Sequence, residues 1–345
     1  MFLINRKTLA LIGATAAAIG STAFFAAPAQ AAGAGLAKVV GSKTVSFQAL
    51  MGKANGVTVT ISGKTVTLTD KVAIKAGKGC KSVSAKKVRC KTSAKTKTLR
   101  IALGDKNDWV RNKTNVHMVA DGGSGNDTLT GGGAWEYLYG GTGKDKIYGN
   151  GGNDEIVGGS AIDLLRGGAG NDKIFGDSGN DKIYGDAGQD KLYGDSGADL
   201  IYGGNDVDVV RAGSGNDWIY GGAGQYTEGE LIYGDTIYGE DGNDTIRGEA
   251  DTDIVEGGAG ADRIWGEDGD DLLAGDSYIY DGVDYLPYGG DSATDAVNGG
   301  ANGHLGDVCV VTGSSSVSEC EGPQQSSLSK SAKKAARPEN IRRAG

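Results

Sequence analysis

Aspartate recurs with a period of nine residues through the middle of this 345-residue chain. Seventeen nine-residue units fill residues 122–274, and aspartate occupies the sixth position in fifteen of them. These fifteen residues are Asp127, Asp145, Asp154, Asp163, Asp172, Asp181, Asp190, Asp199, Asp208, Asp217, Asp235, Asp244, Asp253, Asp262 and Asp271. The two remaining units carry Glu136 and Tyr226 at this position. Carboxylates at such regular intervals suit the binding of hard cations, which prefer oxygen ligands.

A glycine-rich turn and a short strand surround each of these aspartates. In the representative unit Gly176-Asp177-Ser178-Gly179-Asn180-Asp181-Lys182-Ile183-Tyr184, a six-residue turn precedes a three-residue strand. Position eight is aliphatic in sixteen of the seventeen units, which predicts one inward apolar side chain per strand. Two units then complete one coil of eighteen residues, and stacked coils lie about 4.8 Å apart. We therefore predict an all-β fold, a parallel β-roll about 40 Å long.

This stacking brings together aspartates that are eighteen residues apart. Neighbouring carboxylates repel each other unless a cation lies between them. Calcium fits these turns best, because it accepts six to eight oxygen ligands and glycine leaves the turn carbonyls accessible. Magnesium requires a stricter octahedron, and zinc or copper would require histidine or cysteine, which the turns lack.

The repeated unit resembles the GGxGxDxUx nonapeptide of the RTX calcium-binding family. The resemblance covers about half of the chain. It implies a β-roll with each calcium ion between turns of adjacent coils, and it implies that the fifteen aspartates above are the ligands. With a cysteine pair ahead of the repeats, the layout is similar to that of secreted actinobacterial RTX-like calcium-binding proteins, and it implies no enzymatic activity.

The eighteen-residue coil also predicts which aspartates share an edge of the roll. One row holds Asp127, Asp145, Asp163, Asp181, Asp199, Asp217, Asp235, Asp253 and Asp271. This row contains eight pairs of neighbouring aspartates and the other row contains four. With one ion between the members of each pair, we predict about a dozen calcium sites. In a second interpretation, Gly221–Tyr238 contains a four-residue loop insertion that places Glu230 in the ligand position, followed by a shortened unit, Gly234–Tyr238.

Two further patterns concern the outer surface of the roll. Several units carry an acidic residue where the family has its second glycine, namely Asp177, Asp186, Asp195, Glu240, Glu249 and Glu267. We interpret these as solvated charges rather than additional ligands. Tyr184, Tyr202, Tyr220 and Tyr238 are spaced to form a ladder on one face. Such a ladder either stabilises the strands by stacking or binds sugar rings, and we favour the first interpretation.

The rest of the chain divides into further segments. Residues 1–31 form a predicted secretory signal with a cleavage site at Ala29-Gln30-Ala31, so we expect an extracellular protein. Residues 32–100 form a small basic β domain with strands near 57–61 and 65–68, and residues 101–121 an irregular first coil around Asp108. After the roll (122–274) come degenerate repeats with a disulfide-capped end (275–322) and a flexible basic tail (323–345). We expect no transmembrane span.

Charge is distributed unevenly between these segments. Residues 32–120 carry a net charge of +15, whereas residues 122–300 carry −27. The acidic, glycine-rich roll is therefore predicted to be disordered without calcium and folded with it. Binding of the basic segment to anionic cell-wall polymers or nucleic acid is a weaker interpretation than a solvated face or a counterpart to the acidic roll, and we expect no nucleic-acid partner.

Four cysteines in an exported chain predict two disulfides, for which three connectivities are possible. Local pairing of Cys80 with Cys90 and of Cys309 with Cys320 is the simplest. A metal site is the rival interpretation, but the cysteines lack CxxC spacing.

No enzyme motif accompanies the repeats. The chain has two histidines, His117 and His304, and neither an HExxH nor a GxSxG sequence. We therefore expect a non-catalytic calcium-binding structural or surface-interaction module. The alternative is an adhesin or polysaccharide-binding protein that uses the tyrosines, and a weaker third hypothesis is a hydrolase with a site in residues 32–120.

Overall fold

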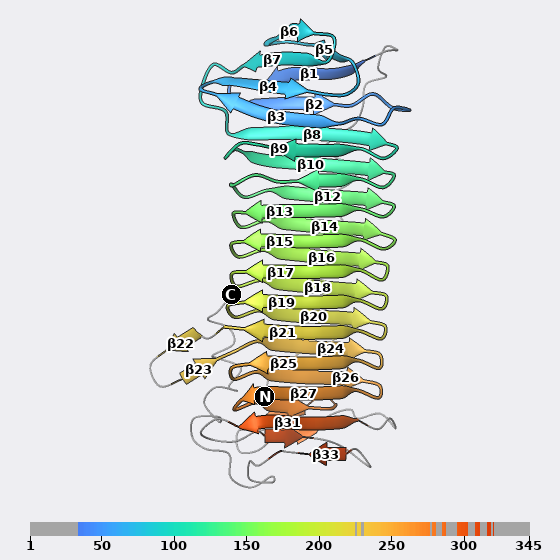
Figure 1. Ribbon diagram of the computed structural model, residues 1–345, viewed down its shortest axis with the longest axis vertical. Coiled ribbons are helices and arrows are strands. Elements are labelled where there is room, and N and C mark those ends of the chain that lie inside the picture. Colours follow the sequence, from blue (N-terminus) through green and yellow to red (C-terminus); the bar gives the residue numbers. More distant parts are fainter. Residues whose placement is uncertain are drawn as a thin grey trace.

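The computed structural model describes residues 34–320 apart from 225, 229–230, 277, 281–284, 288–294, 303–307, 311–315 and 319. The predicted signal at 1–31 and the predicted tail at 323–345 lie outside the described residues. The described chain contains strands and turns and no helix. It forms one long stack of coils with two sheets along its length (Figure 1), of 14 and 15 strands. The predicted all-β solenoid is confirmed.

The first sheet, sheet A, takes every second strand of the roll. Its coil strands are β8 (Thr98–Asp105), β10 (His117–Ser124), β12 (Tyr137–Thr142), β14 (Glu155–Ser160), β16 (Lys173–Ser178), β18 (Lys191–Ser196), β20 (Val209–Ser214), β24 (Thr236–Asp241), β26 (Ile254–Ala259), β28 (Leu272–Ala274) and β32 (Val308–Val310).

The alternate strands form sheet B. They are β9 (Trp109–Asn112), β11 (Thr128–Thr130), β13 (Lys146–Gly151), β15 (Leu164–Ala169), β17 (Lys182–Ala187), β19 (Leu200–Asn205), β21 (Trp218–Ala223), β25 (Thr245–Ala250), β27 (Arg263–Gly269), β31 (Ala296–Asn302) and β33 (Ser316–Ser318).

Neighbouring strands of the central coils are parallel and in an eighteen-residue register, as Ile183 opposite Ile201 illustrates. Position eight points inward in every complete coil, so that Ile183, Leu192 and Ile201 are fully buried. Each coil adds only a thin aliphatic layer to one continuous core.

Seven strands cap the amino-terminal end of the roll. These are β1 (Gly35–Val40), β2 (Thr44–Gln48), β3 (Val57–Ser62), β4 (Thr65–Thr69), β5 (Ile74–Ala76), β6 (Cys80–Ser84) and β7 (Lys87–Lys91). They extend both sheets, because β2 pairs with β8 and β3 pairs with β9, and their apolar side chains join the core of the roll. The strands predicted near 57–61 and 65–68 are β3 and β4, which form an antiparallel pair.

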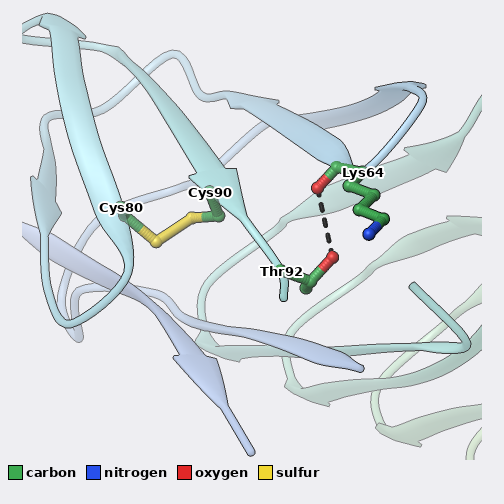
Figure 2. The surroundings of a disulfide bond; sticks show 4 residues. All are labelled: Lys64, Cys80, Cys90 and Thr92. Atoms are coloured by element: carbon green, nitrogen blue, oxygen red, sulfur yellow. Dashed lines mark hydrogen bonds between the residues drawn. A yellow bond between two sulfur atoms is a disulfide. The ribbon is translucent and has the colours of Figure 1, made fainter. Parts of the chain in front are cut away.

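Both predicted disulfides are confirmed, Cys80–Cys90 and Cys309–Cys320. The first joins β6 and β7 in the cap, where Cys80 and Cys90 are cross-strand partners. Figure 2 shows this bond, with the Thr92 hydroxyl nearby donating to the Lys64 carbonyl at 3.1 Å. The second disulfide joins Cys309 of β32, the last strand of sheet A, to Cys320.

Two short hairpins stand outside the coils. β22 (Tyr226–Glu228) pairs with β23 (Leu231–Tyr233), and β29 (Tyr278–Tyr280) pairs with β30 (Tyr285–Pro287). The β22–β23 hairpin projects from the side of the stack (Figure 1). Around it the register is 27 residues instead of eighteen, as in Val209 opposite Thr236.

Both interpretations of Gly221–Tyr238 are therefore wrong. The segment supplies a single half-coil, Gly221 to Gly224 followed by Gly234 to Tyr238, with the hairpin inserted between its turn residues. Glu230 lies outside the described residues. The insertion is as long as one repeat, so the sequence period continues through it although the coil does not. Every unit after the hairpin therefore lies in the other sheet from the one that the sequence predicted.

Candidate metal centres

The position-six residues form two continuous columns along the two edges of the roll. Column 1 precedes the strands of sheet B, and column 2 precedes those of sheet A. Column 1 consists of Asp108, Asp127, Asp145, Asp163, Asp181, Asp199, Asp217, Asp244, Asp262 and Asp295. Column 2 consists of Glu136, Asp154, Asp172, Asp190, Asp208, Asp235, Asp253 and Asp271.

One hydrogen bond repeats along each column. The main-chain N–H of each position-six residue donates to Oδ1 of the aspartate in the next coil, as Asp163 does to Asp181 at 2.7 Å. The inserted hairpin corrects the predicted rows, because Asp217 is followed by Asp244 and Asp208 by Asp235. The fifteen predicted aspartates thus form seven neighbouring pairs in column 1 and six in column 2, where the sequence predicted eight and four.

All fifteen aspartates point into the roll, with no more than 2% of each exposed. They are buried because positions six and eight lie on the same face of the extended chain, as Asp181 and Ile183 do. The second carboxylate oxygen, Oδ2, is buried without a hydrogen-bond partner in thirteen of them. These thirteen are Asp127, Asp145, Asp154, Asp163, Asp172, Asp181, Asp190, Asp199, Asp208, Asp217, Asp235, Asp244 and Asp253. A buried acceptor in this state is costly unless a proton or a cation satisfies it.

In all of these units except that of Asp217, which begins with Ala212, Oδ2 faces a space that the first glycine of the repeat leaves open. A Cβ added to Gly176 would lie 2.6 Å from Asp181 Oδ2 and 2.6 Å from the Gly194 carbonyl oxygen of the next coil. A second glycine, Gly179, has φ = +145°, and a Cβ there would collide with the Ala161 carbonyl. Carboxylate and carbonyl oxygens therefore converge where side chains are absent, which is the ligand chemistry of a calcium site.

Comparison with known families agrees with this chemistry. Residues 119–147, 130–165, 157–192, 193–227, 232–263 and 248–277 match the RTX calcium-binding nonapeptide repeat. These coils are RTX calcium-binding repeats. No curated protein matches the chain. Asp108 precedes the first matched segment and Asp295 follows the last, so both occupy column 1 outside the RTX repeats.

Burial strongly disfavours ionisation of the carboxylates in the RTX repeats. Burial, together with repulsion from the neighbouring carboxylates of the same column, raises the pKa of Asp163 to about 8 and that of Asp208 to about 9. The main-chain hydrogen bond opposes this effect only in part. At neutral pH a cation between the coils would remove the conflict between burial and charge.

The structure limits what the side chains alone can supply. Within the described ranges, no three or more His, Cys, Asp or Glu side chains form a group that could hold a metal ion. This is expected of the RTX arrangement, because each coil contributes one carboxylate to each column. The remaining ligands must be main-chain carbonyls, which suits calcium far better than zinc or copper.

The two exceptional units differ from the rest in different ways. Tyr226 belongs to the inserted hairpin and not to a coil. Glu136 occupies the first place in column 2, and the chain itself satisfies its carboxylate. Asn112 Nδ2 donates to Glu136 Oε1 at 3.3 Å, and the Gly132 N–H donates to Oε2 at 3.1 Å.

Sequence reasoning left two column members out of the ligand set. Asp108 lies nineteen residues before Asp127, in the near-repeat that the sequence identifies as an irregular first coil. Asp295 follows Asp262 after 33 residues. In the sequence, only the degenerate repeats around Asp295 indicate that it could belong to a column.

The six acidic residues that replace the second glycine of the repeat lie outside the columns, and all have positive φ. They are Asp177, Asp186, Asp195, Glu240, Glu249 and Glu267. Three of them are paired with arginines on the outer faces, in the pairs Arg166–Asp186, Arg211–Glu240 and Arg247–Glu267. For these three the ion pair replaces the predicted simple solvation. Such partly exposed pairs add little stability individually.

The tyrosine ladder contains three of its four predicted members. Tyr184, Tyr202 and Tyr220 stack on sheet B with ring centroids 5.0 and 4.8 Å apart. Tyr238 was predicted wrongly, because the inserted hairpin moves it to sheet A. There its ring lies 4.6 Å from the guanidinium carbon of Arg211.

Proposed function

We propose that this chain is a secreted, non-catalytic calcium-binding module whose RTX roll folds as calcium fills the two columns. The observation that carries the proposal is the row of buried Oδ2 atoms without hydrogen-bond donors, which, except at Asp217, face a main-chain carbonyl across an open glycine position. The predicted ligands in this proposal are the fifteen aspartates, with carbonyls of the turns.

The number of ions follows from the corrected columns. Thirteen neighbouring pairs of predicted aspartates give about thirteen sites, close to the dozen expected from the sequence. Each ion would neutralise carboxylates that would otherwise be buried and charged, so binding energy becomes folding energy.

Secretion supports the same proposal from the sequence. The predicted signal at 1–31 would deliver the chain to an environment where calcium is abundant, and two disulfides are typical of exported proteins. No helix in the described part of the chain has the length and apolar character needed to cross a membrane. The roll would then fold after export and present its outer faces as a structural or surface-interaction module.

The packing of the tyrosines does not favour the polysaccharide hypothesis. Tyr184, Tyr202 and Tyr220 stack nearly parallel, with interplanar angles of 3° and 8°, so their faces contact one another. Sugar rings stack on exposed aromatic faces, and Tyr202 offers none. The ladder therefore supports the strands.

The hydrolase hypothesis also lacks a supporting observation. His117 is the one histidine that the structure describes, and its ring stacks on Trp135 at 3.6 Å. Its Nδ1 lies 2.8 Å from the Trp135 carbonyl oxygen. This arrangement positions a structural side chain at the surface of the first coils.

The test of this function is calcium titration of the mature chain, with heat and circular dichroism recorded together. The proposal predicts about thirteen bound ions and a gain of β structure in parallel with binding. Binding of only two or three ions would contradict it.

A further inference from the structure

Column 1 continues beyond the RTX repeats into the amino-terminal cap. The Asp108 N–H donates to Asp127 Oδ1 at 2.7 Å, as within the repeats. The Asn55 N–H in turn donates to Asp108 Oδ1 at 2.5 Å. Since β3 pairs in parallel with β9, Asn55 occupies the position-six place of a coil one level above Asp108.

A third residue, Asp70, lies on the far side of Asn55. The N–H of Gly56, the residue after Asn55, donates to Asp70 Oδ1 at 2.7 Å. Asp70 follows β4, and β3 lies between β4 and β9 in sheet B. Asp70, Asn55 and Asp108 therefore lie one above another at the junction between the cap and the first coil.

Each of these three residues has a buried side-chain oxygen with no hydrogen-bond partner. The atoms are Asn55 Oδ1, Asp70 Oδ2 and Asp108 Oδ2, in residues that are at most 3% exposed. The side-chain amide of Asn55 does not donate to these oxygens, because its Nδ2 donates to the Lys53 and Leu50 carbonyls at 2.8 and 3.4 Å. Three acceptors are thus buried together without a donor. Lys71 is exposed, and its positive charge acts on both Asp70 and Asp108, but it donates to none of the three buried oxygens.

At the start of column 2 a side-chain donor reaches the first carboxylate of the column. There Asn112 Nδ2 donates both to the Val116 carbonyl at 3.0 Å and to Glu136 Oε1 at 3.3 Å. In column 1 the side-chain amide of Asn55 donates only to main-chain carbonyls, so it supplies no hydrogen bond to the carboxylates of Asp70 and Asp108. The two ends therefore differ in chemistry although each contains an asparagine.

We infer that Asp70, Asn55 and Asp108 form a further calcium site that joins the cap to the roll. The inference rests on the proposed function and extends it to residues outside the RTX repeats. Two carboxylates and one amide oxygen are hard ligands of the kind that calcium takes. Because 53 residues separate Asn55 from Asp108, an ion here would close a long loop and dock strands β1–β7 onto the first coil.

The test is a count of bound calcium by equilibrium dialysis on the full mature chain. In the double variant Asp70→Asn, Asp108→Asn, the shapes are kept and both charges are removed. We expect at least one ion fewer than in the unaltered chain, because Asp108 also neighbours Asp127 in column 1, and Asp70→Asn alone, which leaves that pair intact, should lose one. The control is Asp105→Asn, a half-buried residue of the same turn that accepts from the Gly52 N–H, and it should retain the full number.

If the double variant does not fold, Asp70→Asn alone should lose the same ion, since the first coil then keeps Asp108. An unchanged number of ions in the variant that folds overturns the inference and leaves the proposed function intact. An unaltered chain that binds no calcium overturns both.

Discussion

The main-chain N–H of Asp163 donates to Oδ1 of Asp181, eighteen residues later, at 2.7 Å. This bond orients the Asp181 carboxylate and leaves its Oδ2 toward the glycine-lined space between coils. Because the same bond repeats along both columns, the position of each carboxylate depends on the coil before it. Folding of one coil therefore prepares the site shared with the next.

The buried carboxylates predict an unusual dependence of the calcium-free chain on pH. Burial raises the pKa of Asp163 to about 8 and that of Asp181 to about 6, above the ordinary value of 3.8. The calcium-free folded state therefore binds protons more tightly than the unfolded state. Its stability is fully present below about pH 4 and is lost as the pH rises through 6 to 8.

Circular dichroism in EDTA between pH 4 and pH 8 measures this dependence. We expect β structure at the acidic end and its loss toward pH 8. With saturating calcium the β structure should persist up to pH 8, because the ion takes the place of the proton at Oδ2 once the carboxylates ionise. A calcium-free chain that gains structure as the pH rises would contradict the assignment of the buried acids.

Replacing a single column residue should remove calcium locally. In Asp181→Asn the side chain keeps its shape, but its amide cannot act as a charged ligand, so about one or two ions should be lost. The matched control is Asp177→Asn, which changes a carboxylate in the same repeat but outside the columns. Calorimetric titration distinguishes the two, and an equal loss in both variants would argue against the column as the binding site.

A methyl group at Gly176 should be costly, although Ala212 occupies the same position in the unit of Asp217. Gly176→Ala places a carbon in contact with Asp181 Oδ2 and the Gly194 carbonyl, which should cost about 1–3 kcal/mol and weaken calcium binding. Gly151→Ala is the control, because the nearest atom to its Cβ is the Ala169 carbonyl oxygen at 3.8 Å. Thermal unfolding at fixed calcium concentration compares them, and equal midpoints for the two variants would refute the proposed crowding.

The inserted hairpin should be dispensable. Deletion of residues 225–233 leaves Gly-Gly-Ala-Gly-Gly-Asp-Thr-Ile-Tyr, a regular nonapeptide that joins β21 to β24. The number of bound ions should be unchanged, and stability should change by no more than about 1 kcal/mol. Deletion of Gly185–Tyr193, a true half-coil of equal length, should shift all later aspartates to the opposite columns and reduce calcium binding.

The fold and most of the candidate ligands were predictable because one short pattern repeats. Position eight forms the core and position six the columns, so residues such as Ile183 and Asp181 could be assigned from spacing alone. The hairpin could not be recognised, since its length equals the period and Tyr238 therefore kept the spacing of a ladder that it does not join. Asn55 and Asp70 join column 1 through pairing of β3 with β9 and β4, which no local spacing shows.

The most direct test of the account is hydrogen exchange of the mature chain at pH 7.5, with calcium and with excess EDTA. We expect the main-chain N–H groups of the column aspartates, such as Asp163 and Asp199, to be protected with calcium and to exchange freely in EDTA. Equal protection of these groups under both conditions would contradict the claim that calcium binding and assembly of the roll are one event.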